Sequence, residues 1–303
     1  MKKRKILGHQ IAIHVFFILF SLVFLLPMLL ILSISFSDEA TITAVSGANA
    51  GYHLIPRVFS LDAYRYSLRN PHQLIQAYKI TAAESILSTL SSLVVLGMVS
   101  YPLSRSSFAY RKPITFIIFF TMLFSGGQIP SYIVNTRLYH LGDTFWIYIL
   151  PGIAGGAWNT FVIRTFFKGL PEELFESAKI DGARELTIFF RIALPLSTPV
   201  FATIGFMKLL GAWNDWGTAL IYIRNSELYT LQYVLKRILD QVDFLKEMQK
   251  SGGRMAANFQ AAKMPSETMR YAMCVLAAGP MLFAFPFFQK YFEKGLIVGA
   301  VKG

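Results

Sequence analysis

Charged residues are scarce in this chain of 303 residues. Only 15% of its side chains are Asp, Glu, Lys or Arg, against about 25% in a typical soluble domain, whereas 54% are hydrophobic. The mean hydropathy is +0.48, and Phe occurs 27 times. This composition excludes an ordinary soluble globular chain and predicts several membrane-spanning segments.

Cysteine and catalytic motifs are also missing. Cys274 is the only cysteine, so no internal disulfide or cysteine metal cluster can form. The histidines are dispersed, and no HExxH, GxSxG or CxxC pattern occurs, so we expect no metal site and no catalytic residue. The dipeptide Gly-Lys is absent, and with it the GxxxxGK[ST] phosphate loop. If ATP drives this protein, hydrolysis belongs to a separate subunit.

The net charge of +12 could suggest nucleic acid as a partner. However, the basic residues are scattered between apolar runs and form no patch interleaved with aromatic residues. A membrane protein with basic cytoplasmic segments explains the charge better, and we expect no nucleic-acid binding.

Six apolar runs have about the 20 residues that a membrane-spanning helix needs. They lie at residues 12–36, 82–103, 114–134, 144–165, 196–222 and 270–290. The basic residues at 2–5 precede the first run as in a signal peptide. That run is longer than a signal h-region, which predicts an uncleaved span. The predicted fold class is an all-α membrane protein with six transmembrane helices.

Lys and Arg set the predicted orientation, because they are denser in the segments on one side of these runs. Both termini and the loop at 166–195 are therefore predicted to be cytoplasmic, and the loops at 38–81 and 223–269 external. The predicted organisation is an N-terminal part at 1–80 with the first span and first external loop. A core of five spans at 81–303 follows.

The second run is the least hydrophobic and allows two interpretations. It carries Glu84 and the hydroxyl residues Ser85, Ser88, Thr89, Ser91 and Ser92. Small hydroxyl residues are common where transmembrane helices pack closely. Alternatively, this span lines a polar path.

The cytoplasmic loop has the pattern of a helix, a turn and a second helix. Pro171 suits a first helical position, and the acidic residues after it, including Glu173, favour the positive end of the helix dipole. Asp181 and Gly182 predict a turn, because Gly accepts a left-handed backbone. A second helix at 183–193 is expected to end near Pro195.

Within this loop, Glu176-Ser177-Ala178-Lys179-Ile180-Asp181-Gly182 is followed after nine residues by Ile192-Ala193-Leu194-Pro195. The spacing resembles the EAA motif of the membrane subunits of binding-protein-dependent ABC importers. Ser177 departs from it, because alanine is usual there. A solvated amphipathic loop helix is the alternative interpretation.

Further stretches resemble carbohydrate importers of the MalG-like family, of the LplC/YtcP type. These are Ala109–Lys112, Phe124–Pro130, Asp143–Trp146, Ile149–Pro151, Trp213–Trp216 and the C-terminus from Phe287. The resemblance covers residues 10–303. It implies a type I ABC importer permease fold in a bacterial plasma membrane, in which the chain is a transport subunit and not an enzyme.

The resemblance also implies partners: a second homologous permease, two ATPase subunits that hold ATP and Mg, and an extracytoplasmic solute-binding protein that delivers a sugar, expected to be an oligosaccharide. It assigns coupling to the ATPase to Glu173, Glu176, Ser177, Ala178, Asp181, Gly182 and Ala183. It assigns a further ATPase contact to Gly299, Val301 and Lys302, in a tail expected to be flexible after Gly295.

The substrate path is less readable. Asn214 and Asp215 are costly inside an apolar span, so they imply a polar cavity or a helix partner. Trp213 and Trp216 offer rings that could stack on a sugar, although interfacial tryptophans and a helix-bonded Asn214 explain the same residues. In the maltose importer the corresponding half makes little contact with the sugar.

Three other interpretations stay open at this point. They are an ion-gradient-driven secondary transporter, an ABC permease for a non-sugar solute, and a membrane-embedded enzyme. No matching halves of a transporter repeat and no catalytic pair support the first and third.

The external loop at 223–269 contains an amphipathic pattern from Leu228 to Leu245. Its apolar face either packs on the protein itself or helps the loop to contact the binding protein.

Overall fold

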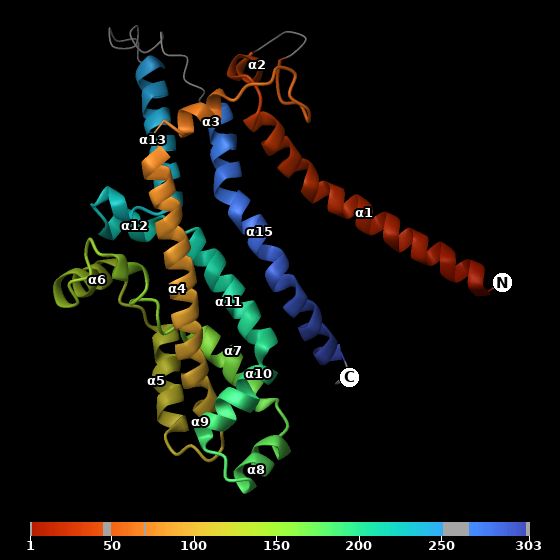
Figure 1. Cartoon of the computed structure of the whole chain (residues 1–303), viewed down its shortest axis with the longest axis vertical. Helices are drawn as coiled ribbons and strands as arrows, with labels where there is room; N and C mark the ends of the chain where they lie inside the picture. Colours follow the sequence, from red (N-terminus) through yellow and green to blue (C-terminus); the bar gives the residue numbers. More distant parts are fainter. Residues whose placement is uncertain (1, 45–49, 70, 251–266, 301–303) are drawn as a thin grey trace. The chain divides into compact units, whose positions relative to one another are not determined.

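The computed structural model describes residues 2–44, 50–69, 71–250 and 267–300. Across these ranges the chain is helical and has no strand beyond an isolated bridge between Ser37 and Phe59 (Figure 1). The α-helical fold class predicted from the sequence is confirmed for this part of the chain.

The first half of the chain contains two helices of 34 residues each, Lys2–Ser35 and Pro71–Ser104. Its elements are α1 (Lys2–Ser35), α2 (Glu39–Thr43), α3 (Asp62–Ser67), α4 (Pro71–Ser104), α5 (Arg111–Leu123), α6 (Gln128–Ile133), the π-helix η1 (Val134–Leu138) and the 3₁₀ helix η2 (Phe145–Tyr148).

The second half alternates short and long helices. Its elements are α7 (Ala157–Lys168), α8 (Glu173–Ile180), α9 (Glu185–Ile188), the π-helix η3 (Phe189–Ala193), α10 (Leu194–Leu196), α11 (Thr198–Trp213), α12 (Gly217–Tyr222), the 3₁₀ helix η4 (Ser226–Leu228), α13 (Leu231–Lys250) and α15 (Glu267–Ala300).

Three described helices are long and apolar enough to cross a membrane: Gln10–Ser35, Pro71–Ser104 and Glu267–Gln289. Two bent pairs raise the number to five if each pair is one span. Arg111–Leu123 with Gln128–Leu138 is bent by 113°, and Glu185–Leu196 with Thr198–Trp213 is bent by 77°.

The third and fourth predicted spans are not single helices. Within 114–134 the helix stops before Gly127, whose φ of +82° cannot continue an α-helix. Within 144–165 the backbone turns between η2 and α7, where Pro151 lacks a donor N–H and Gly155 and Gly156 have φ of +71° and +86°. Glycine and proline therefore break these segments despite their hydrophobicity.

The fifth predicted span, at 196–222, is also interrupted. Helix α11 ends at Trp213, and Asn214 is its C-cap. Oδ1 of Asp215 then accepts a hydrogen bond from the backbone N–H of Thr218 at 3.0 Å, in the first turn of α12. Asn214 and Asp215 thus cap helix ends rather than lie inside a continuous span.

The contacts divide the chain into two compact units. Unit 1 comprises Met1–Pro71 and Leu235–Pro280, and unit 2 comprises His72–Val234 and Met281–Gly303. The domain boundaries predicted above refer to membrane topology, at 1–80 and 81–303, and stay a prediction.

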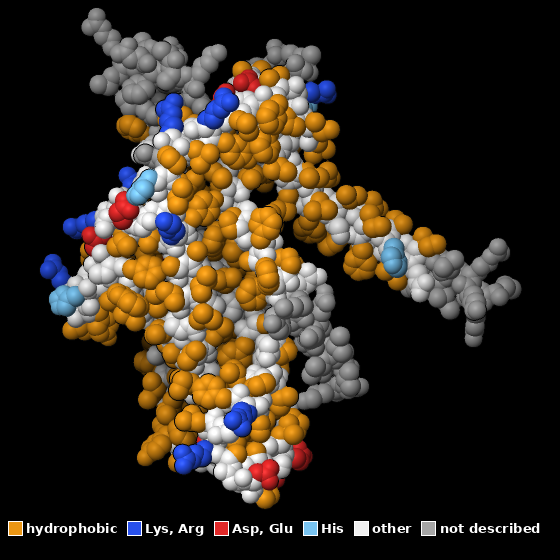
Figure 2. Space-filling model, viewed as in Figure 1, with side chains coloured by type: hydrophobic (Ala, Val, Ile, Leu, Met, Phe, Trp, Pro, Cys, Tyr) orange, Lys and Arg blue, Asp and Glu red, His pale blue; other side chains and the backbone are white. Residues whose placement is uncertain are grey.

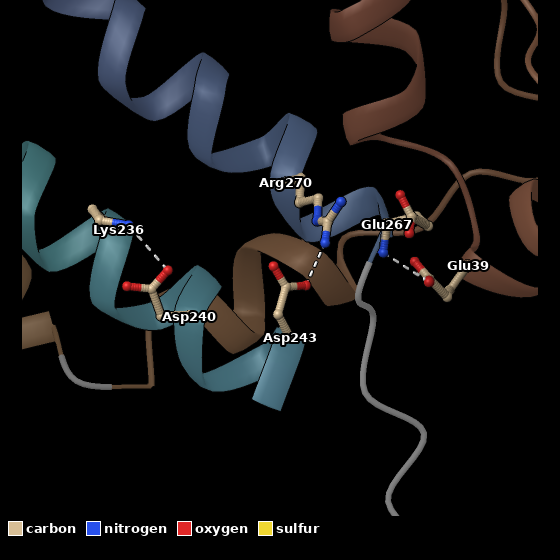
Figure 3. Close-up of polar contacts among 6 residues, drawn as sticks. All are labelled: Glu39, Lys236, Asp240, Asp243, Glu267 and Arg270. Carbon is tan, nitrogen blue, oxygen red and sulfur yellow. Dashed lines mark hydrogen bonds and ion pairs between the residues drawn. The ribbon is translucent and has the colours of Figure 1, made fainter. Parts of the chain in front are cut away.

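Unit 1 contains two polar links that Figure 3 shows. Both carboxylate oxygens of Glu39 accept hydrogen bonds at the N-terminus of α15, from the backbone N–H groups of Glu267 and Thr268 at 2.8 and 2.9 Å. Asp243 of α13 pairs with Arg270 of α15. Lys236 and Asp240 form an ion pair along α13 itself, at 3.2 Å.

The apolar face of α13 is buried, as Leu231, Val234, Leu235 and Val242 show. Of the two interpretations for this amphipathic helix, packing on the protein itself is therefore correct for these residues. Residues 251–266 of the same loop lie outside the described residues.

The hydrophobic core of unit 2 is built from α4, α7, α8, the segment 188–193 and α11. Its buried members are Leu96, Tyr101, Ile163, Phe167, Phe175, Ile188, Phe189, Ala193, Phe201 and Ile204. Helix α7 packs against both α5 and α11. This core positions the loop at 166–195 against the end of α4.

Many large apolar side chains are nevertheless exposed, including Phe16 and Phe24 on α1 and Phe116 and Phe120 on α5. Figure 2 shows hydrophobic side chains along α1 and over the α4–α5 part of unit 2. Apolar surfaces of this extent are typical of helices that face lipid or partner subunits.

The C-terminus differs from its prediction. Gly295 and Gly299 lie within α15, which continues to Ala300, so the prediction of a flexible segment is wrong for these residues. Each glycine costs a helix only about 1 kcal/mol, and the two glycines do not end this helix of 34 residues. Val301 and Lys302 lie outside the described residues.

Candidate coupling site

Helix α8 ends in a turn with a left-handed backbone at Gly182, a conformation that glycine adopts without strain. The backbone N–H of Gly182 donates to the carbonyl of Lys179 at 3.0 Å, and that of Ala183 donates to the carbonyl of Ala178 at 2.9 Å. These two bonds form a Schellman motif, with Gly182 at the left-handed position and φ at +75°. The turn predicted from Asp181 and Gly182 is therefore observed.

The two alanines of the motif have a packing role. Ala178 and Ala183 are both partly buried against the hydrophobic core of unit 2. A Schellman motif commonly pairs an apolar contact between these two positions. Small side chains at both positions let the turn approach the core closely, which gives a physical reason for alanine at this spacing.

The remaining predicted coupling residues face outward. Glu173, Glu176, Ser177 and Asp181 are exposed, and the two glutamates lie in the first turn of α8. The departure at Ser177 therefore changes a surface position and not a buried one. The acidic first turn agrees with the predicted dipole arrangement, and α8 begins two residues after Pro171.

The segment after the turn departs from the prediction of one helix ending near Pro195. A short α9 runs into the π-helix η3, in which the N–H of Leu194 donates to the carbonyl of Phe189, five residues earlier. The helical path continues past Pro195 to Leu196. A π-turn accommodates a proline because it removes the four-residue spacing that the missing N–H would disrupt.

The C-terminal end of α4 holds α8 through Arg105. Its guanidinium Cζ lies 3.4 Å from the ring centroid of Phe175 and 5.1 Å from that of Tyr101. Arg105 is only 9% exposed, and its Nη1 is 3.8 Å from Oε1 of Glu172. Stacking of this kind fixes the guanidinium between two rings and joins α8 to α4.

The same end of α4 holds α9 through Tyr101. The Tyr101 hydroxyl donates to Oε2 of Glu185 at 3.0 Å, and Oε1 of Glu185 is 2.8 Å from Nζ of Lys179. Because Lys179 lies on α8, this chain of contacts connects both helices of the turn to α4. Arg105, Tyr101 and Glu185 were not expected from the sequence motif, since their partners lie far apart in the chain.

An apolar surface lies on this charged loop. Ile180 is 86% exposed and Leu186 is 64% exposed, and they flank the Gly182 turn. The turn therefore presents two large apolar side chains to its surroundings.

The predicted substrate-path residues separate in the structure. Asn214, Asp215 and Trp216 line one cavity of about 580 Å³ in unit 2, but Trp213 does not line it and is buried. The cavity also has Glu84 and Lys208 on its wall. The polar residues of the second and fifth predicted spans thus meet at one place.

This chain is similar in sequence to a known protein family and to several known proteins. The family described as binding-protein-dependent transport system inner membrane component matches residues 9–298. Protein LplC of Bacillus subtilis (strain 168) is 38% identical over 279 residues, which cover 92% of this chain and 90% of that protein. The polygalacturonan/rhamnogalacturonan transport system permease protein YtcP of the same organism is 37% identical over 294 residues, covering 97% and 98%.

A solved structure is similar over nearly the whole chain. It is a chain of a bacterial ABC transporter involved in the import of the acidic polysaccharide alginate, with a TM-score of 0.75 and 28% identity. The match covers 96% of this chain and 98% of that one. With a family match over most of its length and the braced Gly182 turn in the expected place, the chain belongs to the binding-protein-dependent transport system inner membrane components, the permease subunits of ABC importers.

Proposed function

We propose that this chain forms half of the translocation path of an ATP-driven oligosaccharide importer and couples to ATP hydrolysis on a separate subunit. The observation that carries the coupling role is the α8–Gly182–α9 turn, which is braced by Arg105 and Tyr101 and exposes Ile180 and Leu186. Family membership makes the chain a transport subunit and not an enzyme.

The sugar class comes from the relatives. Their names include transport of polygalacturonan or rhamnogalacturonan, arabinooligosaccharides and galactooligosaccharides. An oligosaccharide is therefore the solute that we propose for this chain. An ion-driven secondary transporter does not belong to this family, and a non-sugar solute is an outcome that the experiment below tests.

The proposed assembly has four kinds of component. A second homologous permease completes the path, and two ATPase subunits bind ATP and Mg and receive the two coupling turns. An extracytoplasmic solute-binding protein delivers the sugar to the external side, where we place the loop at 223–269. Glu173, Glu176, Ser177, Ala178, Asp181, Gly182 and Ala183 form the proposed ATPase-facing element, with Gly299, Val301 and Lys302 as a second contact.

The proposed topology has six spans in a bacterial plasma membrane and both termini in the cytoplasm. Five of the spans correspond to the three long helices and the two bent pairs. The sixth is the segment at 144–165, in which η2 and α7 together cross the membrane. Tyr101, Arg105 and the Gly182 turn then share the cytoplasmic side, as coupling to a soluble ATPase requires.

Copurification and transport test this function together. The chain is expressed with its partner permease, ATPase and binding protein, and the complex is reconstituted into vesicles. We expect the ATPase to copurify and hydrolysis to rise when the binding protein carries an oligosaccharide from a panel of pectic, arabinan and galactan fragments. Uptake without ATP, or stimulation by a non-sugar solute alone, would contradict the proposal.

A further inference from the structure

Helix α4 carries a stripe of polar side chains that are buried and unpaired. Oε2 of Glu84 and the hydroxyls of Ser85, Ser88, Thr89 and Ser92 have no hydrogen-bond partner. The stripe follows the helical repeat, since residues four apart lie on one face. Unpaired buried polar groups destabilise a protein, so each of these positions requires a reason.

Close helix packing explains the part of the stripe nearer the cytoplasmic end. A Cβ built on Gly155 would lie 2.7 Å from the hydroxyl of Ser92, and one built on Gly205 would lie 3.8 Å from Thr89. Glycine and small hydroxyl residues allow this approach, which is the first of the two interpretations of the polar run.

Close packing does not explain Glu84 and Ser88. Both line the cavity of about 580 Å³ in unit 2. Glu84 is only 2% exposed, and Ser88 is 9% exposed. A buried carboxyl oxygen without a partner at this depth is more costly than a hydroxyl. The second interpretation, a polar path, therefore fits this part of α4.

The rest of the cavity wall supplies further polar groups and a ring. The polar side chains are Tyr148, Lys208, Asn214 and Asp215, and Trp216 contributes an indole. Most of the polar atoms are already oriented by the protein: the Tyr148 hydroxyl donates to the carbonyl of Leu228 at 2.8 Å, and Nδ2 of Asn214 donates to that of Leu210 at 2.9 Å. Glu84 and Ser88 are the members of this wall whose buried side-chain oxygens have no partner.

We propose that this cavity is a sugar-unit binding site within this half of the transporter, with Glu84 and Ser88 as its hydroxyl-binding residues. The ligand class is a pyranose or furanose unit of an oligosaccharide, held through vicinal hydroxyl groups. The proposal rests on the proposed function, since it takes the transported solute as the ligand.

The chemistry of the wall favours hydroxyl groups over a sugar carboxylate. Hydroxyl groups donate hydrogen bonds to carboxyl oxygens, and the two carboxyl groups of Glu84 and Asp215 outnumber the one ammonium group, that of Lys208. The indole of Trp216 offers an apolar face for the C–H face of the ring. The cavity is also large enough, because small-molecule sites have volumes of roughly 300–1,000 Å³.

Two side chains of α4 provide a matched pair for the test. Ser85 and Ser88 both carry buried hydroxyls without a partner, but only Ser88 lines the cavity. Ser85→Ala removes the same atom as Ser88→Ala on the same helix, and therefore controls for effects on helix packing.

The experiment measures sugars moved per ATP hydrolysed in vesicles that contain the complete transporter and its binding protein. The probes are galactobiose, arabinobiose and digalacturonate. For a probe that the wild-type complex moves, we expect Glu84→Gln to lower this ratio about tenfold and Ser88→Ala about threefold, because the first variant replaces a buried carboxyl group and the second removes one hydroxyl group. Ser85→Ala should retain the wild-type ratio.

The possible results separate this site from the function on which it rests. If the wild-type complex moves none of the three probes, both the proposed oligosaccharide function and the site are wrong. If it moves one, but Glu84→Gln and Ser88→Ala behave as Ser85→Ala does, the site alone is wrong. If Glu84→Gln prevents assembly, the comparison of Ser88→Ala with Ser85→Ala decides.

Discussion

The guanidinium Cζ of Arg105 lies over the ring of Phe175, 3.4 Å from the ring centroid. Arg105 follows the last residue of α4, and Phe175 is buried in the first turn of α8. The contact therefore joins α4, which is long and apolar enough to cross a membrane, to the helix that precedes the Gly182 turn. If the proposed ATPase subunit binds α8, this contact would connect movement of α8 to α4.

We expect Arg105→Lys to weaken that connection although the charge is kept. An ammonium group cannot stack as a planar guanidinium does, and cation–π contacts contribute about 1–2 kcal/mol when partly desolvated. In reconstituted vesicles the variant should hydrolyse more ATP per sugar moved. Lys112→Arg, an exposed substitution at the start of α5, is the control, and an unchanged ratio in Arg105→Lys would contradict the role of this contact.

The second contact between α4 and the turn is the hydrogen bond from Tyr101 to Glu185. Tyr101→Phe removes the hydroxyl but keeps the ring, whose centroid lies 5.3 Å from that of Phe189. We expect a loss of about 1 kcal/mol, because the acceptor is charged but partly exposed. Thermal unfolding of the purified complex measures it, and an unchanged unfolding temperature in Tyr101→Phe would contradict the role of this hydrogen bond.

Substitutions of Gly182 test whether the conformation of this turn is required for coupling to ATP hydrolysis. A Cβ at this position would have no atom within 4 Å, so a side chain adds only backbone strain at φ +75°. That strain is about 1–2 kcal/mol for Val and less for Asn, which tolerates the left-handed region. Gly182→Val should reach the membrane yet show weaker stimulation of ATP hydrolysis by loaded binding protein, and Gly182→Asn should lie between.

Gly169 supplies the control for that series. It lies in the same loop but has φ of −82°, which any residue adopts. Gly169→Ala should therefore leave stimulated hydrolysis unchanged. Equal losses in the Gly169 and Gly182 variants would show that the effect is not specific to the turn.

Local chemistry made the coupling turn predictable from sequence. Gly182 has one favourable role at a helix end, and the spacing of Ala178 and Ala183 reports the geometry of one capping motif. The polar stripe of α4 was also visible, because a carboxyl and several hydroxyls stand out in an apolar run. The sequence did not show which of these residues pack closely against other segments and which line a cavity. That distinction depends on Gly155 and Gly205, which approach α4 from other segments.

The interruptions of the predicted spans could not be predicted from hydropathy alone. Hydropathy over 144–165 reports only that the segment is apolar, and Pro151, Gly155 and Gly156 decide whether one helix forms. Arg105 could not be assigned either, since a lone arginine after a span is equally typical of a basic cytoplasmic loop. The roles of such residues depend on contacts with distant parts of the chain, which a single sequence does not identify.

A substitution of Glu39 tests the hydrogen bonds that join α2 to α15 within unit 1 (Figure 3). Its carboxylate accepts hydrogen bonds from the backbone N–H groups of Glu267 and Thr268 and from the hydroxyl of Thr268 at 2.8 Å. Glu39→Gln keeps one oxygen and places an amide donor opposite N–H donors. We expect about 1–2 kcal/mol less protection of the first α15 amides, measured by hydrogen exchange. Thr43→Val, on the same short helix, should leave that protection unchanged.

Asp143 should make part of unit 2 sensitive to acid. Its Oδ1 accepts hydrogen bonds from the backbone N–H groups of Asn225 at 2.8 Å and Arg224 at 2.9 Å, and these bonds hold the pKa of the carboxyl below its usual range. A lowered pKa in the folded state gives stability that is fully present above the unfolded value of about 3.9 and is lost as the pH falls through the folded pKa.

Asp143→Asn separates this charge effect from the shape of the turn. Asparagine keeps a carbonyl acceptor and tolerates the φ of +56° that Asp143 adopts. The variant should therefore unfold at a lower temperature than wild type at pH 7, whereas the difference should shrink steadily below about pH 4, where the wild-type carboxylate becomes protonated. Thermal unfolding of the detergent-solubilised complex between pH 3 and pH 7 would measure it, over a range set by the usual Asp pKa of about 4. A constant difference between the two proteins across that range would mean that the hydrogen bonds to Asn225 and Arg224 do not depend on the charge of Asp143.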